Sequence, residues 1–297
     1  MTQATFSAEV GRGLGRDELP AYAPMLDAYQ RAFEPELKRI VGELPIAPGH
    51  RVLDLACGAG AYTRWLAERI GPHGVAVGVD LSMAYLEQAR AQTPPGDEGG
   101  ARIEFTHGDA ARLPFDEGAF DLSFCAQSLY SLPDPAAALA EMVRVTRTGG
   151  AIVVLENDMV HQFMLPWPVD LELAVRQAQI AQLREQEKDR AERFFVGRHL
   201  GALFEQAGID SYEIRSSALH RTGRLREAEE AYLGEYLTDL AERVRSYLSS
   251  RDRERFDAIT DPQAPTYLLR ARGFHMTVLN QIAVGTCRAA GPLRVSS

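Results

Sequence analysis

The sequence predicts an α/β fold with a doubly wound, mostly parallel sheet of seven strands and a helical cap insertion. Between about residues 50 and 156, apolar strand-like runs alternate with helical patterns. A glycine-rich turn directly follows the first of these runs. A long, charge-rich helical segment, Leu171 to Arg193, then interrupts the alternation without a strand of its own. Strands separated by helices need crossover connections, and such connections produce parallel sheets.

Each element is expected from its local pattern. An amphipathic helix from Tyr22 to Val41 carries apolar residues at three- and four-residue steps. Runs of strand type are bounded by turn residues, and helical runs have the longer period. The expected strands are Arg51–Ala56, Val75–Asp80, Arg102–His107, Asp121–Cys125, Ala151–Glu156, Ser211–Ser217 and a last strand at Tyr267–Leu279. The expected helices of the core are Ala61–Ile70, Met83–Gln92, Pro135–Val145 and Arg198–Gly208.

This order of elements divides the chain into four expected parts. Residues 1–48 form an N-terminal helical lid, and 49–156 form the ligand-binding core. Residues 157–197 are a helical cap insertion, and 198–297 complete the core with a second helical insertion at about 225–257. Open parallel sheets hold ligands at the carboxyl ends of their strands. Because the cap follows the fifth strand at that end, we expect it and the N-terminal helix to close over the ligand.

Length and composition restrict the class of protein. The 297 residues suffice for one large domain or for one domain with an elaborated cap. The chain is 45% hydrophobic and 25% charged, and no run approaches the roughly 18 consecutive apolar residues of a membrane span. The first residues lack the continuous apolar core of a secretory signal, so the expected compartment is the cytoplasm.

Charge and cysteine usage indicate a small-molecule partner. The net charge is −9, and the arginines are scattered among acidic residues, which disfavours a nucleic-acid surface. Cys57, Cys125 and Cys287 lie far apart without a CxxC pair or a partner histidine. We therefore expect free thiols and neither a metal site nor a disulfide framework. The oligomeric state is left open.

The stretch Val52 to Tyr62, VLDLACGAGAY, indicates a nucleotide-like ligand. Its glycines, Gly58 and Gly60, follow a strand, so backbone N–H groups can approach a ligand closely. Asp80 ends the next strand 80 − 60 = 20 residues later, which suits a carboxylate that accepts hydrogen bonds from a ribose. An ordinary tight turn is the plain alternative for the glycines alone.

Two ribose-containing cofactors compete for this turn. The dinucleotide fingerprint requires a third glycine where this chain has Thr63. Asp54 would repel the phosphates of a dinucleotide and would attract a cation. S-adenosyl-L-methionine has a ribose, an adenine and a positively charged amino-acid tail, and it has no phosphate. The turn therefore favours that cofactor, with a nicotinamide-dependent oxidoreductase as the alternative.

Over about residues 50 to 156 the chain resembles the class I S-adenosylmethionine-dependent methyltransferases, most closely the small-molecule group that includes the ubiquinone/menaquinone methyltransferases. The resemblance implies a Rossmann-like core and methyl transfer. Ala56 stands where that family more often has glycine, and we expect alanine to be tolerated if its φ stays negative. The segments that carry the resemblance are Val52–Gly60, Val79–Ser82, Gly108–Ala110, Phe120–Cys125 and Met142–Gly150, the last being the turn before the fifth strand.

The resemblance also implies roles for individual residues. Core packing is the plain alternative for Leu81 and Met83, and satisfaction of helix-start N–H groups is the alternative for Thr63. The methionine portion of the cofactor is implied to contact Asp54, Ala56, Gly58 and Gly60, and its carboxylate Tyr62 and Thr63. The ribose is implied to contact Asp80, and the adenine Leu81, Met83, Gly108, Asp109 and Ala110. Cys125 and Gln127 are implied to contact the cofactor from the side of strand four.

The acceptor is expected beyond strands four and five. Tyr130 and His161 are the candidate catalytic residues: Tyr130 is implied to line the acceptor pocket, and His161 is the candidate base because histidine titrates near neutral pH. A purely structural role is the plain alternative for each. Phe163, Met164 and Trp167 are expected to form an apolar lid over a small, fairly apolar or aromatic acceptor, a specialised metabolite, and ordinary packing of the cap is the plain alternative. Whether O, N or C is methylated stays open. A cofactor-binding protein of the same fold that transfers no methyl group is a further alternative.

Overall fold

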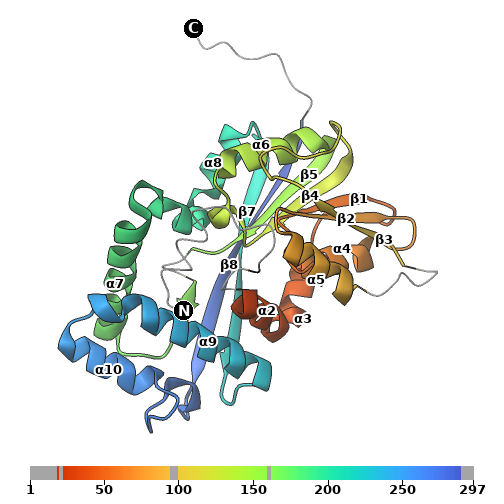
Figure 1. The fold of residues 1–297 in the computed structure, drawn as a ribbon. Helices are drawn as coiled ribbons and strands as arrows, with labels where there is room; N and C mark the ends of the chain where they lie inside the picture. Colours follow the sequence, from red (N-terminus) through yellow and green to blue (C-terminus); the bar gives the residue numbers. More distant parts are fainter. Residues whose placement is uncertain (1–18, 20–22, 94–99, 159–161, 289–297) are drawn as a thin grey trace.

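One mixed sheet organises the protein, as the computed structural model in Figure 1 shows. The structure describes residues 19, 23–93, 100–158 and 162–288. Its strands follow the order β3-β2-β1-β4-β5-β8-β6, and β7 pairs with β8 along nearly its whole length. The strands are β1 (Arg51–Leu55), β2 (Val75–Asp80), β3 (Arg102–His107), β4 (Phe120–Ala126), β5 (Thr146–Glu156), β6 (Phe163–Met164), β7 (Tyr212–Thr222) and β8 (His275–Thr286).

The expected fold class is confirmed. Strands β1 to β5 are mutually parallel, and β8 runs antiparallel to β5, β6 and β7. The two-residue strand β6 adds an eighth member to the seven that were expected. Successive residues of β1 are buried on opposite sides of the sheet, Val52 against one layer of helices and Leu53 against the other. This burial on both faces explains why the strands of the core are almost continuously apolar.

Two layers of helices cover the sheet. α3 (Glu34–Gly42) and α4 (Ala61–Ile70) pack with Val52 and Phe124 on one face, and α6 (Pro135–Val145) and α8 (Leu200–Gln206) cover the other. α5 (Met83–Gln92) begins at Ser82, whose hydroxyl accepts a hydrogen bond from the Tyr85 N–H. Asp134 caps α6 in the same way, with proline at the first helical position.

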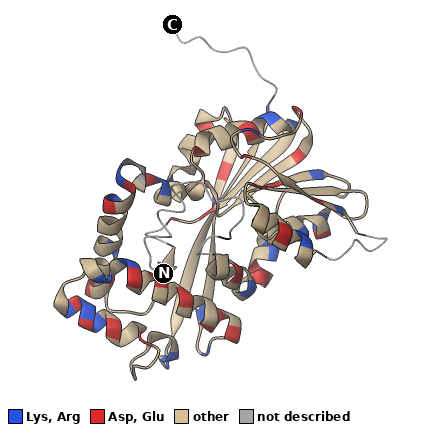
Figure 2. Cartoon of the chain, viewed as in Figure 1, with Lys and Arg blue, Asp and Glu red and all other residues tan. Residues whose placement is uncertain are grey.

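Further helices lie beside the carboxyl ends of the strands. They are α2 (Ala23–Ala32), α7 (Val169–Glu187), the 3₁₀ segment η2 (Lys188–His199), α9 (Glu227–Val244) and α10 (Ser250–Thr260). α2 packs along α9, where the Tyr29 and Tyr232 rings lie 5.3 Å apart. Both signs of charge alternate on the outer faces of α9 and α10 (Figure 2), with ion pairs such as Arg255–Asp170. None of the described helices is long and apolar enough to cross a membrane.

Several boundaries differ from expectation, among them the end of β7, which lies at Thr222 rather than Ser217. The helix expected from Tyr22 to Val41 is two helices within its described part, because Pro35 near the start of α3 forces a break at Phe33. The last strand begins at His275 rather than Tyr267, and it ends at Thr286. Tyr267, Leu268 and Leu269 are buried at a short 3₁₀ turn and do not form a strand.

The fifth strand also starts earlier than expected. Thr146 already pairs with Phe120, and the register of β4 with β5 shifts before Ala151 pairs with Leu122. The segment expected as a turn therefore belongs to β5 as an irregular extension. Gly149 within it has a φ of +77°, which only glycine adopts at little cost.

Gly60, at the start of α4, is expected to tolerate no side chain. Its φ is +76°, and a Cβ there would lie 2.8 Å from the Phe105 ring. Gly208 has nearly the same φ, +77°, with open space around it. Gly208→Ala should cost about 1–2 kcal/mol of unfolding free energy through backbone strain alone. Gly60→Ala should cost about 1–3 kcal/mol more because of the clash, as urea unfolding will measure. Equal costs at the two positions would contradict the steric reading.

Candidate active site

The carboxyl ends of β1, β2 and β4 surround a cavity of about 150 Å³, here called the turn cavity. It lies where the sheet order reverses between β1 and β4, the position at which open α/β sheets bind ligands. Tyr85 of α5 and Leu26 of α2 contribute to its wall. Eight residues expected from the sequence line it: Ala56, Gly58, Asp80, Leu81, Gly108, Asp109, Ala110 and Gln127.

Asp80 is held rigidly at the end of β2. Its Oδ2 accepts the Gly58 N–H at 2.9 Å, and its Oδ1 accepts the Ser82 N–H at 2.8 Å. Burial raises the pKa of this carboxyl, and the two backbone hydrogen bonds oppose that rise. Each carboxylate oxygen has more than one acceptor site, so both remain able to accept a ligand hydroxyl. The side chain thus links the glycine turn to the strand end while it borders the cavity.

Ala56 does not have the negative φ under which alanine was expected to be tolerated. Its φ is +55°, in the left-handed region, so alanine is present at a strained position and not at one with negative φ. Gln127, after β4, has a φ of +51°. The Ser128 hydroxyl lies 3.4 Å from the Ala56 carbonyl oxygen and joins the two turns. Two strained residues therefore border the same cavity, as is common at ligand sites.

Other expected cofactor residues lie behind the lining. The Thr63 hydroxyl donates a hydrogen bond of 2.6 Å to Asp54, and burial raises the pKa of Asp54 to about 7. Tyr62 packs against Phe124, and its hydroxyl is buried without a partner among the described residues. Residues of this group that are absent from the cavity wall are Asp54, Gly60, Tyr62, Thr63, Met83 and Cys125. Direct contacts from them to a cofactor remain predictions.

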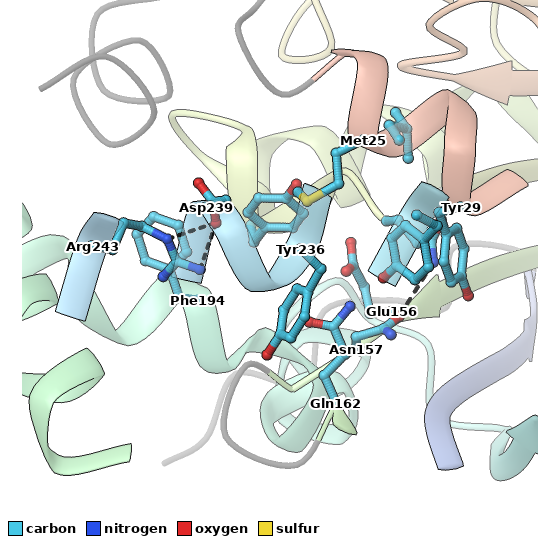
Figure 3. A pocket seen from close by; sticks show the side chains of 13 residues that line it. Met25, Tyr29, Glu156, Asn157, Gln162, Phe194, Tyr236, Asp239 and Arg243 are labelled. Carbon is cyan, nitrogen blue, oxygen red and sulfur yellow. Dashed lines mark hydrogen bonds and ion pairs between the residues drawn. The ribbon is translucent and has the colours of Figure 1, made fainter. Parts of the chain in front are cut away.

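A second cavity, of about 120 Å³, adjoins the first and is here called the tyrosine cavity. Leu26 and Gln127 belong to the walls of both cavities, so the two spaces meet at these side chains. Figure 3 shows α2 and α9 contributing residues from opposite sides. The wall consists of Met25, Leu26, Tyr29, Gln127, Tyr130, Glu156, Asn157, Gln162, Phe194, Tyr232, Tyr236, Asp239 and Arg243.

Tyr130 is placed in the tyrosine cavity, whereas His161 lies outside the described residues. The role proposed for His161 therefore remains a prediction. Phe163 is buried behind the cavity wall, with its ring 4.3 Å from that of Tyr236. Met164 is 54% exposed, so it does not close the cavity in this structure. Trp167 packs against Phe256.

Glu156, at the end of β5, is the titratable group that sequence reasoning did not assign to the site. It is 1% exposed, and its Oε1 accepts the N–H groups of Ser128 and Leu129 at 2.8 and 2.7 Å. Burial raises its pKa to about 8. Its position after a buried strand was a signal that could have identified it, because β5 ends beside β4 at the ligand edge of the sheet.

The thiols and the other acidic groups indicate no further centre. Cys57, Cys125 and Cys287 are all buried and free. Within the described part of the chain, no three His, Cys, Asp or Glu side chains gather closely enough to hold a metal ion. The turn cavity and the tyrosine cavity are therefore the candidate sites for ligand binding and catalysis.

Known proteins share this core. Residues 53–154 match the methyltransferase domain family. A demethylmenaquinone methyltransferase from Staphylococcus aureus is 35% identical over 120 residues, which are 40% of this chain and 48% of that protein. The chain thus spans about half the length of the curated relatives that it matches.

Solved structures share the fold at low sequence identity. The YcgJ protein from Bacillus subtilis is 19% identical, with 86% of this chain and all of that chain covered and a TM-score of 0.54. A putative methyltransferase from Bacillus halodurans is 17% identical, with 85% and 99% covered and a TM-score of 0.50. Residues 53–154 thus match the methyltransferase domain family in sequence, and the two solved structures share the fold of the chain.

Proposed function

We propose that the protein transfers the methyl group of S-adenosylmethionine, held in the turn cavity, to a small, fairly apolar or aromatic metabolite held in the tyrosine cavity. The observation that carries this proposal is the meeting of the two cavities at Gln127 and Leu26. A donor and an acceptor in adjoining spaces can be aligned for direct transfer, which removes much of the entropic cost of their encounter.

The residues of the turn cavity fit this cofactor. Asp80 and Asp109 are the charged side chains among its described lining residues, and neither lysine nor arginine is present there. An acidic wall suits a ligand that is positively charged and has no phosphate. Asp80 would accept hydrogen bonds from the ribose, and Gly108, Asp109 and Ala110 would border the adenine. Bound there, the sulfonium supplies an activated methyl group.

The tyrosine cavity supplies the acceptor side. Its rings and the methionine side chain offer an apolar surface that excludes water from the reacting groups. Gln127 stands between the cavities, where its amide can orient either ligand. Specificity for the acceptor would come from α2 and α9, because these helices provide Tyr29, Tyr232 and Tyr236.

Calorimetry tests the cofactor assignment. The purified protein is expected to bind S-adenosylmethionine or S-adenosylhomocysteine, and NAD should not bind measurably because its two phosphates would face the acidic wall. NAD binding that is tighter than S-adenosylhomocysteine binding would overturn the proposal. Release of S-adenosylhomocysteine during incubation with candidate acceptors then distinguishes a methyltransferase from a protein that only binds the cofactor.

A further inference from the structure

We infer that the acceptor is a basic amine, whose ammonium group is received between the carboxyl of Glu156 and the faces of the surrounding tyrosines. The inference rests on the proposed function and names the chemical class of the acceptor. In Figure 3, Glu156 and Asn157 lie at the cavity with Tyr236 on one side and Tyr29 on the other. Charge, aromatic surface and unpaired polar atoms support it separately.

The charge of the cavity wall is the first support. Three charged residues line it, and Arg243 is tied to Asp239 by an ion pair of 2.7 Å. Glu156 makes no ion pair with any described residue. Without a counter-ion, this buried carboxyl keeps its proton up to a pKa of about 8, and a ligand that brings a positive charge favours its ionised form. A carboxylate or phosphate ester would instead bring a negative charge that opposes ionisation of Glu156.

Aromatic side chains line the same cavity as this carboxyl. The rings of Tyr29 and Tyr232 are 5.3 Å apart, and those of Tyr130 and Phe194 are 6.0 Å apart on the η2 side. The faces of such rings attract cations, more strongly where water is excluded. An aromatic wall that includes a carboxyl therefore complements an ammonium group better than it complements a hydroxyl.

The tyrosines themselves stay neutral. Burial raises the pKa of Tyr29 and of Tyr236 to about 12. The Tyr29 hydroxyl already donates a hydrogen bond of 3.1 Å to Asn280. These phenols accordingly serve as surfaces and donors, not as bases. Proton exchange near neutral pH falls to Glu156, whose own pKa is raised to about 8 by burial.

The hydrogen bonds of Glu156 leave acceptor sites for the ligand. The N–H groups of Ser128 and Leu129 donate to Oε1, and the Asn157 N–H also hydrogen-bonds the carboxyl, which has about four lone-pair sites when it is ionised. Oε2 is then the atom that can take a proton from the ammonium group and leave the nitrogen lone pair free. The nitrogen–carbon bond forms as the carbon–sulfur bond breaks, with the electron pair left on sulfur. The products are a methylated ammonium and an uncharged thioether.

Two side-chain amides complete the recognition surface. The Gln127 Nε2 donates to the Asn157 Oδ1 at 3.4 Å, while Gln127 Oε1 and Asn157 Nδ2 are buried without partners. Exchanging O and N in both amides reverses this hydrogen bond and still leaves one acceptor and one donor unpaired. A ligand that carries an N–H can therefore be held by the free acceptor beside Glu156.

Three probes of nearly equal shape test the inference: 2-phenylethylamine, 2-phenylethanol and phenylacetate. Calorimetry on the full chain, with and without saturating S-adenosylhomocysteine, is expected to show the amine binding about tenfold or more tightly than either of the others. Glu156→Gln keeps an oxygen for the two backbone N–H groups and should abolish this preference, with alcohol affinity unchanged. Glu213→Gln, an exposed carboxyl on β7, is the matched charge control and should keep the preference.

The outcomes separate the two proposals. Equal or tighter binding of the alcohol or the acid by the wild-type protein would overturn the amine inference, whatever the variant does. A preference that survives in Glu156→Gln would also overturn it, because the carboxyl would then not hold the cation. Failure to bind S-adenosylhomocysteine would overturn the proposed function instead, and the measurement without that ligand still reports the charge preference of the cavity.

Discussion

Asp80→Ala is expected to weaken binding of S-adenosylmethionine about ten- to a hundredfold. Hydrogen bonds to a charged group contribute about 1.5–3 kcal/mol, which corresponds to that loss of affinity. The structure adds a second consequence, because the Asp80 carboxylate also accepts the N–H groups of Gly58 and Ser82. The variant should therefore lose stability as well as affinity, and both must be measured, by urea unfolding and by calorimetry.

Asp121→Ala is the matched control for this experiment. Asp121 also accepts a backbone N–H, from Arg51 at 2.7 Å, but it lines neither cavity. Its loss should lower stability and leave cofactor affinity nearly unchanged. If Asp80→Ala loses only as much affinity as Asp121→Ala, the carboxylate of Asp80 does not hold the ribose, and its role is confined to the glycine turn.

The sequence predicted the core well because the signals there are local. Strands β1 to β3 and helices α4 to α6 match expectation to within one residue, since apolar runs and capping residues such as Ser82 mark their ends. The position of Asp80 followed from the same logic, because a residue at the end of a parallel strand must lie at the ligand edge of the sheet.

The acceptor side could not be predicted in this way. Tyr29 hydrogen-bonds Asn280, 251 residues away, and Tyr232 of α9 meets it only through tertiary packing. The spacing of Tyr232 and Tyr236 predicts a shared helix face, but not what that face covers. Burial could not be predicted for Glu156 either. In the sequence it is an acidic residue at the end of a strand, and it becomes a candidate proton acceptor only because the fold encloses it.

The backbone conformation of Ala56 could not be predicted from the sequence either. The residue type favours a negative φ, and the structure has +55° because the turn must pass between β1 and α4 beside the Ser128 hydroxyl. Local preference was overridden by the geometry of the sheet edge. The sequence shows that alanine occupies this turn, but it does not show that the backbone of that alanine is strained.

The stability of the unliganded protein is expected to fall as pH rises from 5 to 6.5. Burial raises the pKa of Asp54 from 3.8 to about 7 and that of Glu156 from 4.5 to about 8. In this pH window both groups are protonated in the folded protein and largely ionised in the unfolded chain. The folded state therefore binds more protons, and raising the pH favours unfolding. This contribution is fully present below about pH 4 and is lost as pH passes the folded pKa values.

Asp54→Asn isolates one of these two groups. Each such carboxyl contributes a slope of about 1.4 kcal/mol per pH unit, so the variant should lose stability with pH less steeply than the wild type by about that amount. The asparagine oxygen can still accept the Thr63 hydroxyl, which preserves the local packing. Urea unfolding at several pH values between 5 and 6.5 measures both slopes. Asp170→Asn is the control, because Arg255 lowers the pKa of Asp170 to about 2, so it does not titrate in this window. Parallel curves for the wild type and Asp54→Asn would show that Asp54 is already ionised in the folded protein, with the cost of its burial offset by the Thr63 hydrogen bond and by Arg64 nearby.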